Sequence, residues 1–240
     1  MMGTNAEFAE KIKNYMNGFA QVVPYQKGDG LLLMDFTAAN TALTDEILCD
    51  TSLFSKYVEA QLQKAGSKYG IGGYNEHRTI YSRSHVFDTP AGEAPRRLHL
   101  GTDIWGPAGT PVYAPLPGTV HSVGFNSAFG DYGATLILQH DIDGAIFHTL
   151  YGHLSLHSIE DKKEGQTIEK GDWIAAFGEP AENGAWPPHL HFQLIIDMQG
   201  WKGDYPGVWQ FSEREKYLAN CPDPVLILNL VSKGHEAKGF

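Results

Sequence analysis

The sequence predicts a mainly β protein, an antiparallel β-sandwich or open barrel with an N-terminal α/β extension. Three observations support this fold class. Short apolar stretches, each ended by turn residues, fill the chain from His99 to Asp197. The 27 glycines and 13 prolines supply many turns. Asp143 and Gly144 separate two of the apolar stretches, and this pair favours the positive φ angles of a hairpin turn.

The first 90 residues are expected to form a helical extension with a connector. The candidate helices carry apolar residues at helical spacing or resemble helical turns, and they cover residues 6–19, 45–48 and 53–65. Gly66 is the expected end of the last helix, and Leu31 to Phe36 is a short strand candidate. Residues 87–97 are rich in proline and glycine, which indicates a connector.

The strands expected in the following β domain, residues 91–200, are short and apolar; they cover residues 118–123, 134–140, 145–153, 173–177 and 189–196. Residues 201–240 are expected to add a helix, Ser212 to Ala219, and an apolar strand, Val225 to Val231, that pack on this domain. The chain therefore has three expected parts.

The charge balance and the apolar runs exclude several classes of protein. Lys and Arg number 18 against 28 Asp and Glu, a net charge of −10, which argues against nucleic-acid binding and against tight attachment to an anionic membrane or cell wall. No apolar run approaches the roughly 18 residues of a membrane span, and no signal peptide follows Met1. The sequence as given predicts a cytoplasmic protein; export would require a signal preceding Met1. Cys49 and Cys221 lie far apart, which favours two buried free thiols over a disulfide.

Histidine is concentrated in the β region. His189 and His191 are separated by one residue, so in a strand both imidazoles lie on one side of the sheet. His99 and Asp103 would lie about 13 Å apart in a straight strand, whereas two ligands of one metal have donor atoms about 3 Å apart. The chain must therefore curl between them, which Gly101 permits.

Two histidine nitrogens and one carboxylate form a catalytic zinc set that leaves a position for water. Further histidines could take a proton from that water or stabilise an oxyanion. The same ligand set also suits the Fe(II) of an oxygenase, but the two additional histidines favour hydrolysis. Strand spacing alone leaves open which histidine of the His189–His191 pair binds the metal.

Five sequence blocks carry a resemblance to a known family: residues 97–103, 106–120, 150–155, 165–172 and 189–193. In order and spacing they resemble the lysostaphin/LytM-type zinc metalloendopeptidases, which have a peptidoglycan DD-metalloendopeptidase-like domain. The resemblance implies an antiparallel β fold of the duplicated-hybrid-motif type. It implies Zn²⁺ held by His99, Asp103 and His191, with His153 and His189 as the catalytic pair.

The resemblance also implies a function, that of a zinc-dependent endopeptidase. The expected substrate is a peptide or peptidoglycan, with cleavage in peptidoglycan cross-bridges or another small-residue peptide. The alternative is a metal-binding but non-hydrolytic regulatory or binding module in the cytoplasm, whose usual sign is a missing ligand or catalytic histidine. A lipoyl-type carrier domain would need an exposed lysine at a tight turn, which the sequence lacks there.

Two groups of residues are candidates for the surroundings of the site. Tyr151 and Trp186 are expected to border a substrate groove. Tyr74 to Arg78 is a dense polar and aromatic cluster just upstream of the β region, where a loop on a rigid scaffold often determines specificity. The segment is expected over or beside the metal cleft, with its occluding residues being Asn75, Glu76 and His77.

Overall fold

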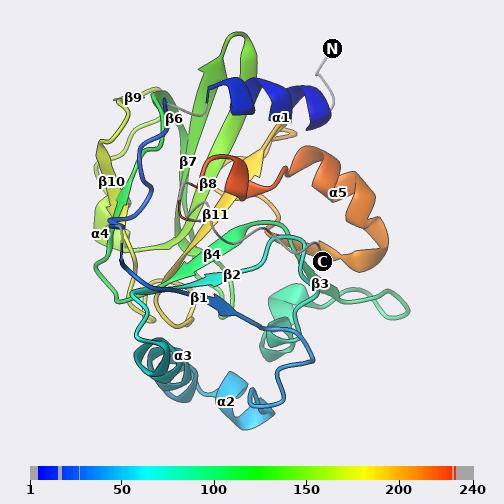
Figure 1. The fold of residues 1–240 in the computed structure, drawn as a ribbon. Helices are drawn as coiled ribbons and strands as arrows, with labels where there is room; N and C mark the ends of the chain where they lie inside the picture. Colours follow the sequence, from blue (N-terminus) through cyan, green and yellow to red (C-terminus); the bar gives the residue numbers. More distant parts are fainter. Residues whose placement is uncertain (1–4, 16–17, 27, 229, 231–240) are drawn as a thin grey trace.

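A computed structural model describes residues 5–15, 18–26, 28–228 and 230 of the chain (Figure 1). Its centre is an eight-stranded mixed sheet in the order β1-β2-β4-β11-β8-β7-β6-β9. The strands are β1 (Leu31–Met34), β2 (Tyr69–Gly72), β4 (Thr102–Trp105), β6 (Gly118–Asn126), β7 (Gly133–Ile142), β8 (Ala145–Leu154), β9 (Thr167–Ile168) and β11 (His189–Ile195). The mainly β fold class predicted from the sequence is therefore confirmed.

Two small sheets and five α-helices accompany the central sheet in the described part of the chain. The small sheets pair β10 (Trp173–Ala176) with β5 (Pro111–Tyr113) and β12 (Val208–Gln210) with β3 (Arg96–His99). The helices are α1 (Asn5–Asn14), α2 (Asp45–Cys49), α3 (Thr51–Ala65), α4 (Leu156–Ile159) and α5 (Arg214–Asn220). None of the helices described is long and apolar enough to cross a membrane.

The N-terminal extension adds two strands to the sheet that carries the site. Strand β2 pairs antiparallel with β4, and β1 pairs parallel with β2, which makes the sheet mixed. Helix α3 begins at Thr51 because the Asp50 carboxylate accepts bonds from the first backbone N–H groups, and it ends at Gly66, whose φ is +61°. Phe54, Val58 and Leu62 lie one turn apart on its buried face.

The β7–β8 hairpin has the predicted turn. Asp143 and Gly144 adopt φ angles of +50° and +77°, and the strands pair on either side of them. Most of the apolar side chains of this hairpin lie in the main core, where Phe147 packs against Phe8 of α1 with ring centroids 5.0 Å apart. The two strands lie between β11 and β6 in the sheet, and their turn extends to the top of the molecule beside α1 (Figure 1).

The predicted C-terminal strand is wrong over the described residues. Pro224–Leu226 forms a 3-10 turn, since Pro224 lacks a backbone N–H and the Asp223 carboxylate accepts a bond from Val225 N–H. Residues 229 and 231 of the expected strand lie outside the described residues. The preceding helix exists, as α5.

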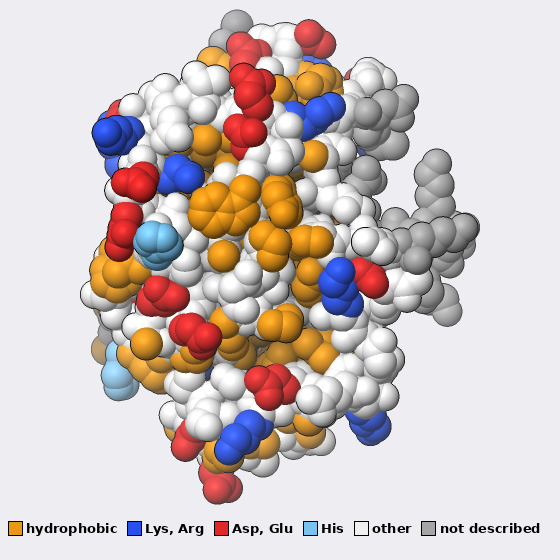
Figure 2. Space-filling model, turned by 90° about the vertical axis from the view of Figure 1, so that its left-hand side faces the viewer, with side chains coloured by type: hydrophobic (Ala, Val, Ile, Leu, Met, Phe, Trp, Pro, Cys, Tyr) orange, Lys and Arg blue, Asp and Glu red, His pale blue; other side chains and the backbone are white. Residues whose placement is uncertain are grey.

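Both cysteines are free thiols, as predicted, but only Cys221 is buried, because Cys49 lies exposed at the end of α2. The face in Figure 2 carries interspersed acidic and basic side chains around a central group of hydrophobic ones, without a broad basic patch. This face matches the low basic content of the sequence.

Candidate metal centre and active site

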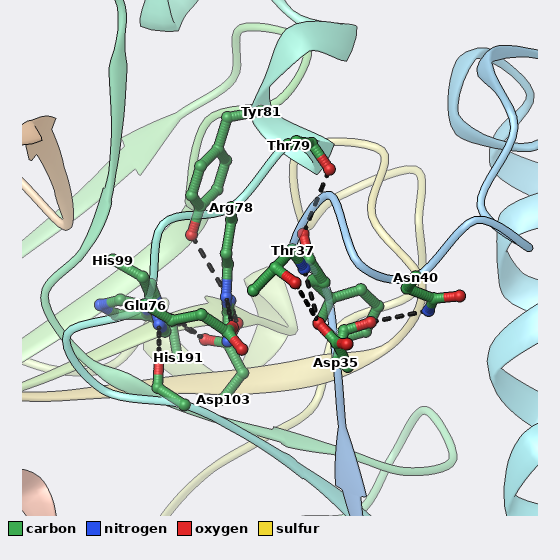
Figure 3. Close-up of polar contacts among 12 residues, drawn as sticks. Asp35, Thr37, Asn40, Glu76, Arg78, Thr79, Tyr81, His99, Asp103 and His191 are labelled. Carbon is green, nitrogen blue, oxygen red and sulfur yellow. Dashed lines mark hydrogen bonds and ion pairs between the residues drawn. The ribbon is translucent and has the colours of Figure 1, made fainter. Parts of the chain in front are cut away.

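His99, Asp103 and His191 meet at one point of the sheet. Register between β4 and β11 places His191 opposite Asp103, and His99 ends β3, the strand that precedes β4 in the chain and pairs with β12. His99 Nε2 lies 3.0 Å from His191 Nδ1, and Asp103 Oδ1 lies 3.3 Å and 3.1 Å from these two nitrogens. Figure 3 shows the three side chains pointing toward one another. Three donor atoms from three elements therefore face a common centre.

The chemistry of this donor set fits a divalent metal. Bonds of about 2 Å around one ion place ligand atoms roughly 3 Å apart, the spacing found here. All three side chains are buried, and His99 Nε2, His191 Nδ1 and Asp103 Oδ1 face one another. His99, Asp103 and His191 could thus hold a zinc ion with a further position open to water.

The bend between His99 and Asp103 occurs as predicted, since β3 ends at His99 and β4 begins at Thr102. Glycine is required at position 101 for a further reason. A Cβ atom there would lie 2.6 Å from Cε1 and Nε2 of the His191 ring. Gly101 therefore permits the close approach of a ligand on the neighbouring strand as well as the bend.

Each ligand has a second contact that orients it. His99 Nδ1 donates to the Gly73 carbonyl at 2.9 Å, which leaves Nε2 as the nitrogen that can bind a metal. His191 Nε2 donates to Gln193 Oε1 at 2.8 Å, which leaves Nδ1. Asp103 uses Oδ2 in an ion pair with Arg78 and faces the histidines with Oδ1 (Figure 3).

Electrostatics leave two of the three ligands, His99 and Asp103, in the protonation states that bind a metal. Burial and then the nearby Arg78 guanidinium lower the pKa of His99 to about 4 although Asp103 acts to raise it, so the imidazole is neutral at neutral pH. Burial acts to raise the pKa of Asp103, but His99 and Arg78 outweigh burial and hold this pKa well below its usual range. The site therefore presents an ionised carboxylate and a neutral His99 imidazole.

A second histidine pair lies beside this centre. The rings of His153 and His189 are 4.1 Å apart, and the His153 and His191 rings are 6.3 Å apart. His153 Nδ1 donates to the Asn183 carbonyl and His189 Nδ1 to the Pro187 carbonyl, at 2.8 Å and 2.7 Å. In both rings this leaves Nε2 as the proton-accepting nitrogen.

Both rings of this pair are held neutral. Burial lowers the pKa of His189 to about 4, and burial with the neighbouring His189 lowers that of His153 well below its ordinary value. His153 has φ +61°, a conformation that is uncommon outside glycine and often found at functional sites. At neutral pH the ring is therefore unprotonated at Nε2, the form that a general base requires.

An aromatic cleft of about 340 Å³ opens onto the centre. Its lining includes Asp103, His153, His189 and His191. Trp186 lines the cleft, with its indole packed near His153, and its place beside a substrate stays a prediction. The prediction for Tyr151 is wrong: it is fully buried in the main core, its ring packs on Phe192, and it is not among the described residues that line the cleft.

The segment expected to occlude the site runs beside it. The Asn75 side chain accepts a bond from Arg214 Nε at 2.6 Å, Glu76 forms an ion pair with Arg78, and the His77 ring packs on Phe211. None of Asn75, Glu76 and His77 is among the described residues lining the cleft. An occluding role for them stays a prediction.

Sequence reasoning missed two residues of the site, Tyr132 and Gln193, and it named Arg78 only as a member of the Tyr74 to Arg78 cluster, without its contact with Asp103. The Tyr132 hydroxyl lies 3.4 Å from His191 Nε2, and Tyr132 lines the cleft. Gln193 follows His191 by two residues and therefore shares its face of the strand, a signal that would have identified it. Tyr132 carries no such local signal, and the sequence does not indicate the ion pair of Arg78 with Asp103, because tertiary contacts bring both residues to the ligands.

Comparison with known proteins relates the region that carries these histidines and Asp103 to a peptidase family. Residues 97–202 of this chain match the family described as "Peptidase family M23". An L-Ala–D-Glu endopeptidase of Bacillus subtilis is 30% identical over 173 residues, which cover 65% of this chain and 51% of that protein. An uncharacterized metalloprotease of Haemophilus influenzae is 38% identical over 101 residues, 42% of this chain and 19% of that protein. The chain thus spans about half of the length of the first relative and about a fifth of the length of the second.

Solved structures of similar proteins include a zinc-containing peptidase from Vibrio cholerae, with 31% identity, a TM-score of 0.34 and coverage of 45% of this chain and 30% of that chain. The lysostaphin catalytic domain from Staphylococcus simulans has 19% identity, a TM-score of 0.39 and coverage of 68% of this chain and 96% of that chain. Both predicted ligand motifs, at His99 to Asp103 and His189 to His191, lie inside the matched residues. Residues 97–202 of this chain belong to peptidase family M23.

Proposed function

We propose that this protein is a zinc-dependent endopeptidase that hydrolyses a peptide bond in peptidoglycan. The observation that carries the proposal is the convergence of His99, Asp103 and His191 beside the neutral pair His153 and His189. The complete set of ligands and histidines supports hydrolysis over the alternative of a non-hydrolytic binding module. The full three-ligand set also leaves a position for water.

Peptidoglycan is supported by the relatives, among them the Bacillus L-Ala–D-Glu endopeptidase and three peptidoglycan DD-endopeptidases of Vibrio cholerae. The aromatic cleft supports a peptide substrate, since its lining includes Tyr81, Trp186 and Trp209. We infer a substrate whose scissile bond lies over His191, with flanking residues against these rings.

Zinc bound at the three ligands would lower the pKa of a water molecule and polarise the peptide carbonyl. The protein's own residues then have separate tasks. His153 and His189 offer Nε2 to accept a proton from the attacking water and return it to the leaving amine. Tyr132, whose pKa burial raises well above its usual range, stays protonated and can donate a hydrogen bond to developing negative charge.

The proposal is tested by digestion of purified peptidoglycan with zinc-loaded protein, followed by mass spectrometry of the released fragments. We expect cleavage at a single type of peptide bond. His153→Ala and His189→Ala should keep the zinc and lose about 10²- to 10⁴-fold in rate, because each removes a proton-transfer group. His121→Ala, a partly exposed histidine of β6 outside the cleft lining, is the matched control and should keep full activity.

Two results would contradict the proposal. Fully zinc-loaded protein that releases no fragment from peptidoglycan or from synthetic stem and cross-bridge peptides would refute hydrolysis of this substrate class. Loss of zinc in His153→Ala with full activity in His189→Ala would refute the division into ligands and proton-transfer residues.

A further inference from the structure

A buried arginine from outside the M23 match contacts the candidate metal centre. Arg78 is fully buried, and its Nη1 forms an ion pair with Asp103 Oδ2. Its Nε bonds to Glu76 Oε2 at 2.6 Å, and its guanidinium lies 5.4 Å from the centroid of the Phe36 ring. Figure 3 shows Arg78 lying between the Glu76 and Asp103 carboxylates. Burial of a guanidinium is costly unless it is paired, and both partners of Arg78 are carboxylates, one of them a candidate metal ligand.

The segment that carries Arg78 is fixed to the site by backbone bonds. Asn75 N–H donates to the His99 carbonyl, His99 N–H donates to the Glu76 carbonyl, and Arg78 N–H donates to the Arg97 carbonyl. These three bonds hold residues 75–78 alongside β3, whose last residue is His99. The position of Arg78 therefore depends on the same strand that presents a ligand.

Strand β2 also makes room for the guanidinium. Gly72 pairs with Asp103 in the β2–β4 ladder, and a Cβ atom on Gly72 would lie 2.5 Å from Arg78 Nη2. The next residue, Gly73, accepts the bond from His99 Nδ1. Residues 72–78 thus supply the second contact of two of the three ligands.

The charges of Arg78, Glu76 and Asp103 leave Asp103 Oδ1, the oxygen that faces the histidines, available to bind a metal. Arg78 carries one positive charge and contacts two carboxylates, Glu76 and Asp103. Glu76 therefore offsets part of the guanidinium charge, and the three side chains together keep one negative charge. Asp103 is held through Oδ2 while Oδ1 faces His99 and His191.

We propose that Arg78 is a positioning residue that fixes Asp103 for metal binding, so that residues 72–78 are a component of the metal centre. The proposal rests on the metal centre of the proposed function. Contacts behind a ligand set its orientation, and their loss typically weakens metal affinity about 10- to 100-fold. A planar guanidinium can hold two carboxylates at fixed angles, which a lysine ammonium cannot.

The test compares zinc affinity in the full chain by competition with a chromogenic chelator. We expect Arg78→Met to bind zinc about 10- to 100-fold more weakly and Arg78→Lys to lie between this variant and the parent. The matched control is Arg83→Met. Arg83 is also buried and lies in the next turn, but it contacts Thr51 and the rings of Phe54, Phe129 and Trp186 instead of the ligands. It should keep the parent affinity.

A second readout separates positioning from fold stability. With Co²⁺ in place of zinc, the visible absorption reports the ligand geometry, and it should change in Arg78→Met and stay unchanged in Arg83→Met. Unchanged zinc affinity and an unchanged Co²⁺ spectrum in folded Arg78→Met would overturn the proposal. If Arg78→Met fails to fold, parent-like affinity and spectrum in Arg78→Lys would overturn it instead.

Failure of the proposed function gives a different pattern. A parent protein that binds no zinc at His191, seen as equal affinity in His191→Ala, would remove the metal centre itself. A parent that binds zinc there while the Arg78 variants match it would refute only the positioning role.

Discussion

At the scale of single residues, burial controls what the histidines of this protein can do. The imidazoles of His99, His153 and His189 are enclosed, and burial lowers each pKa, so they are neutral where a surface histidine would be partly charged. A backbone carbonyl receives the Nδ1 proton of each ring. A neutral ring with a fixed tautomer leaves Nε2 of His99 able to bind a metal, and Nε2 of His153 and of His189 able to accept a proton.

His140, outside the site, gives a stability test of the same effect. It is buried in β7, where Nδ1 donates to the Pro117 carbonyl and Nε2 lies 2.8 Å from Thr149 Oγ1. Burial lowers its pKa to about 4, whereas the unfolded chain has the ordinary value of about 6.5. Its neutral form therefore stabilises the fold above pH 6.5, and this contribution is lost as the pH falls from 6.5 toward 4.

We expect the free energy of unfolding to fall by about 2 kcal/mol more between pH 7.5 and pH 5 in the parent than in His140→Gln. Urea unfolding in the presence of a chelator measures this difference, and the other buried histidines titrate equally in both proteins. Parallel losses of stability in the two proteins would show that His140 does not carry the effect.

Prediction from sequence succeeded where the residues that form the site lie only a few positions apart in the chain. His189 and His191 share a strand face by spacing alone, and the bend at Gly101 follows from the distance between His99 and Asp103. The collision that a side chain at Gly101 would make with His191 could not be foreseen, because His191 is 90 positions away in the chain. Arg78 reaches Asp103 by the same kind of tertiary contact.

At the scale of elements, strand β2 connects the N-terminal extension to the site. It lies between β1 and β4, and β4 carries Asp103. Sequence reasoning expected a strand at 31–36 and a helix at 53–65, and the structure has them at 31–34 and 51–65, because caps and periodicity are local. It missed β2, whose short run Tyr69–Gly72 is half glycine and forms a strand only because β1 and β4 flank it. The error at Val225 to Val231 has the opposite cause, since an apolar run was taken for a strand although Pro224 begins a 3-10 turn.

A chain shortened to begin at Pro90 tests whether the extension can be removed. It would lack β1 and β2, together with Phe36 and Phe54, whose rings pack 5.0 Å and 6.2 Å from that of Trp105. Loss of two buried aromatic side chains alone costs several kcal/mol. We therefore expect a much lower melting temperature and at least about tenfold weaker zinc binding, measured by calorimetry and chelator competition.

The matched control is a chain that begins at Gly18 and lacks only α1. Helix α1 packs Phe8 and Ile12 on the main core, away from the metal centre. This control should lose stability and keep its zinc affinity. A chain from Pro90 that melts like the full protein, binds zinc equally and hydrolyses faster would instead identify the extension as a removable cover.

At the scale of the whole molecule, the M23 match accounts for residues 97–202, and the described structure joins residues on both sides of it to the same site. Arg78 and Gly73 reach the ligands from the N-terminal side, and Tyr205 and Trp209 line the cleft from the C-terminal side. The net charge of −10 gives no long-range attraction to an anionic wall. Substrate binding is therefore expected to depend on contacts in the cleft, and a cytoplasmic location stays a prediction.

The most direct test of the central claim is the metal content of the protein. Elemental analysis of parent, His191→Ala and His189→Ala, each purified without added metal, compares a proposed ligand with a neighbour two residues away on the same strand. We expect one zinc per chain in the parent and in His189→Ala, and little in His191→Ala, because that variant removes the ligand whose Nδ1 faces His99 and Asp103. Full zinc occupancy in His191→Ala, or iron in place of zinc in the parent, would contradict the claim.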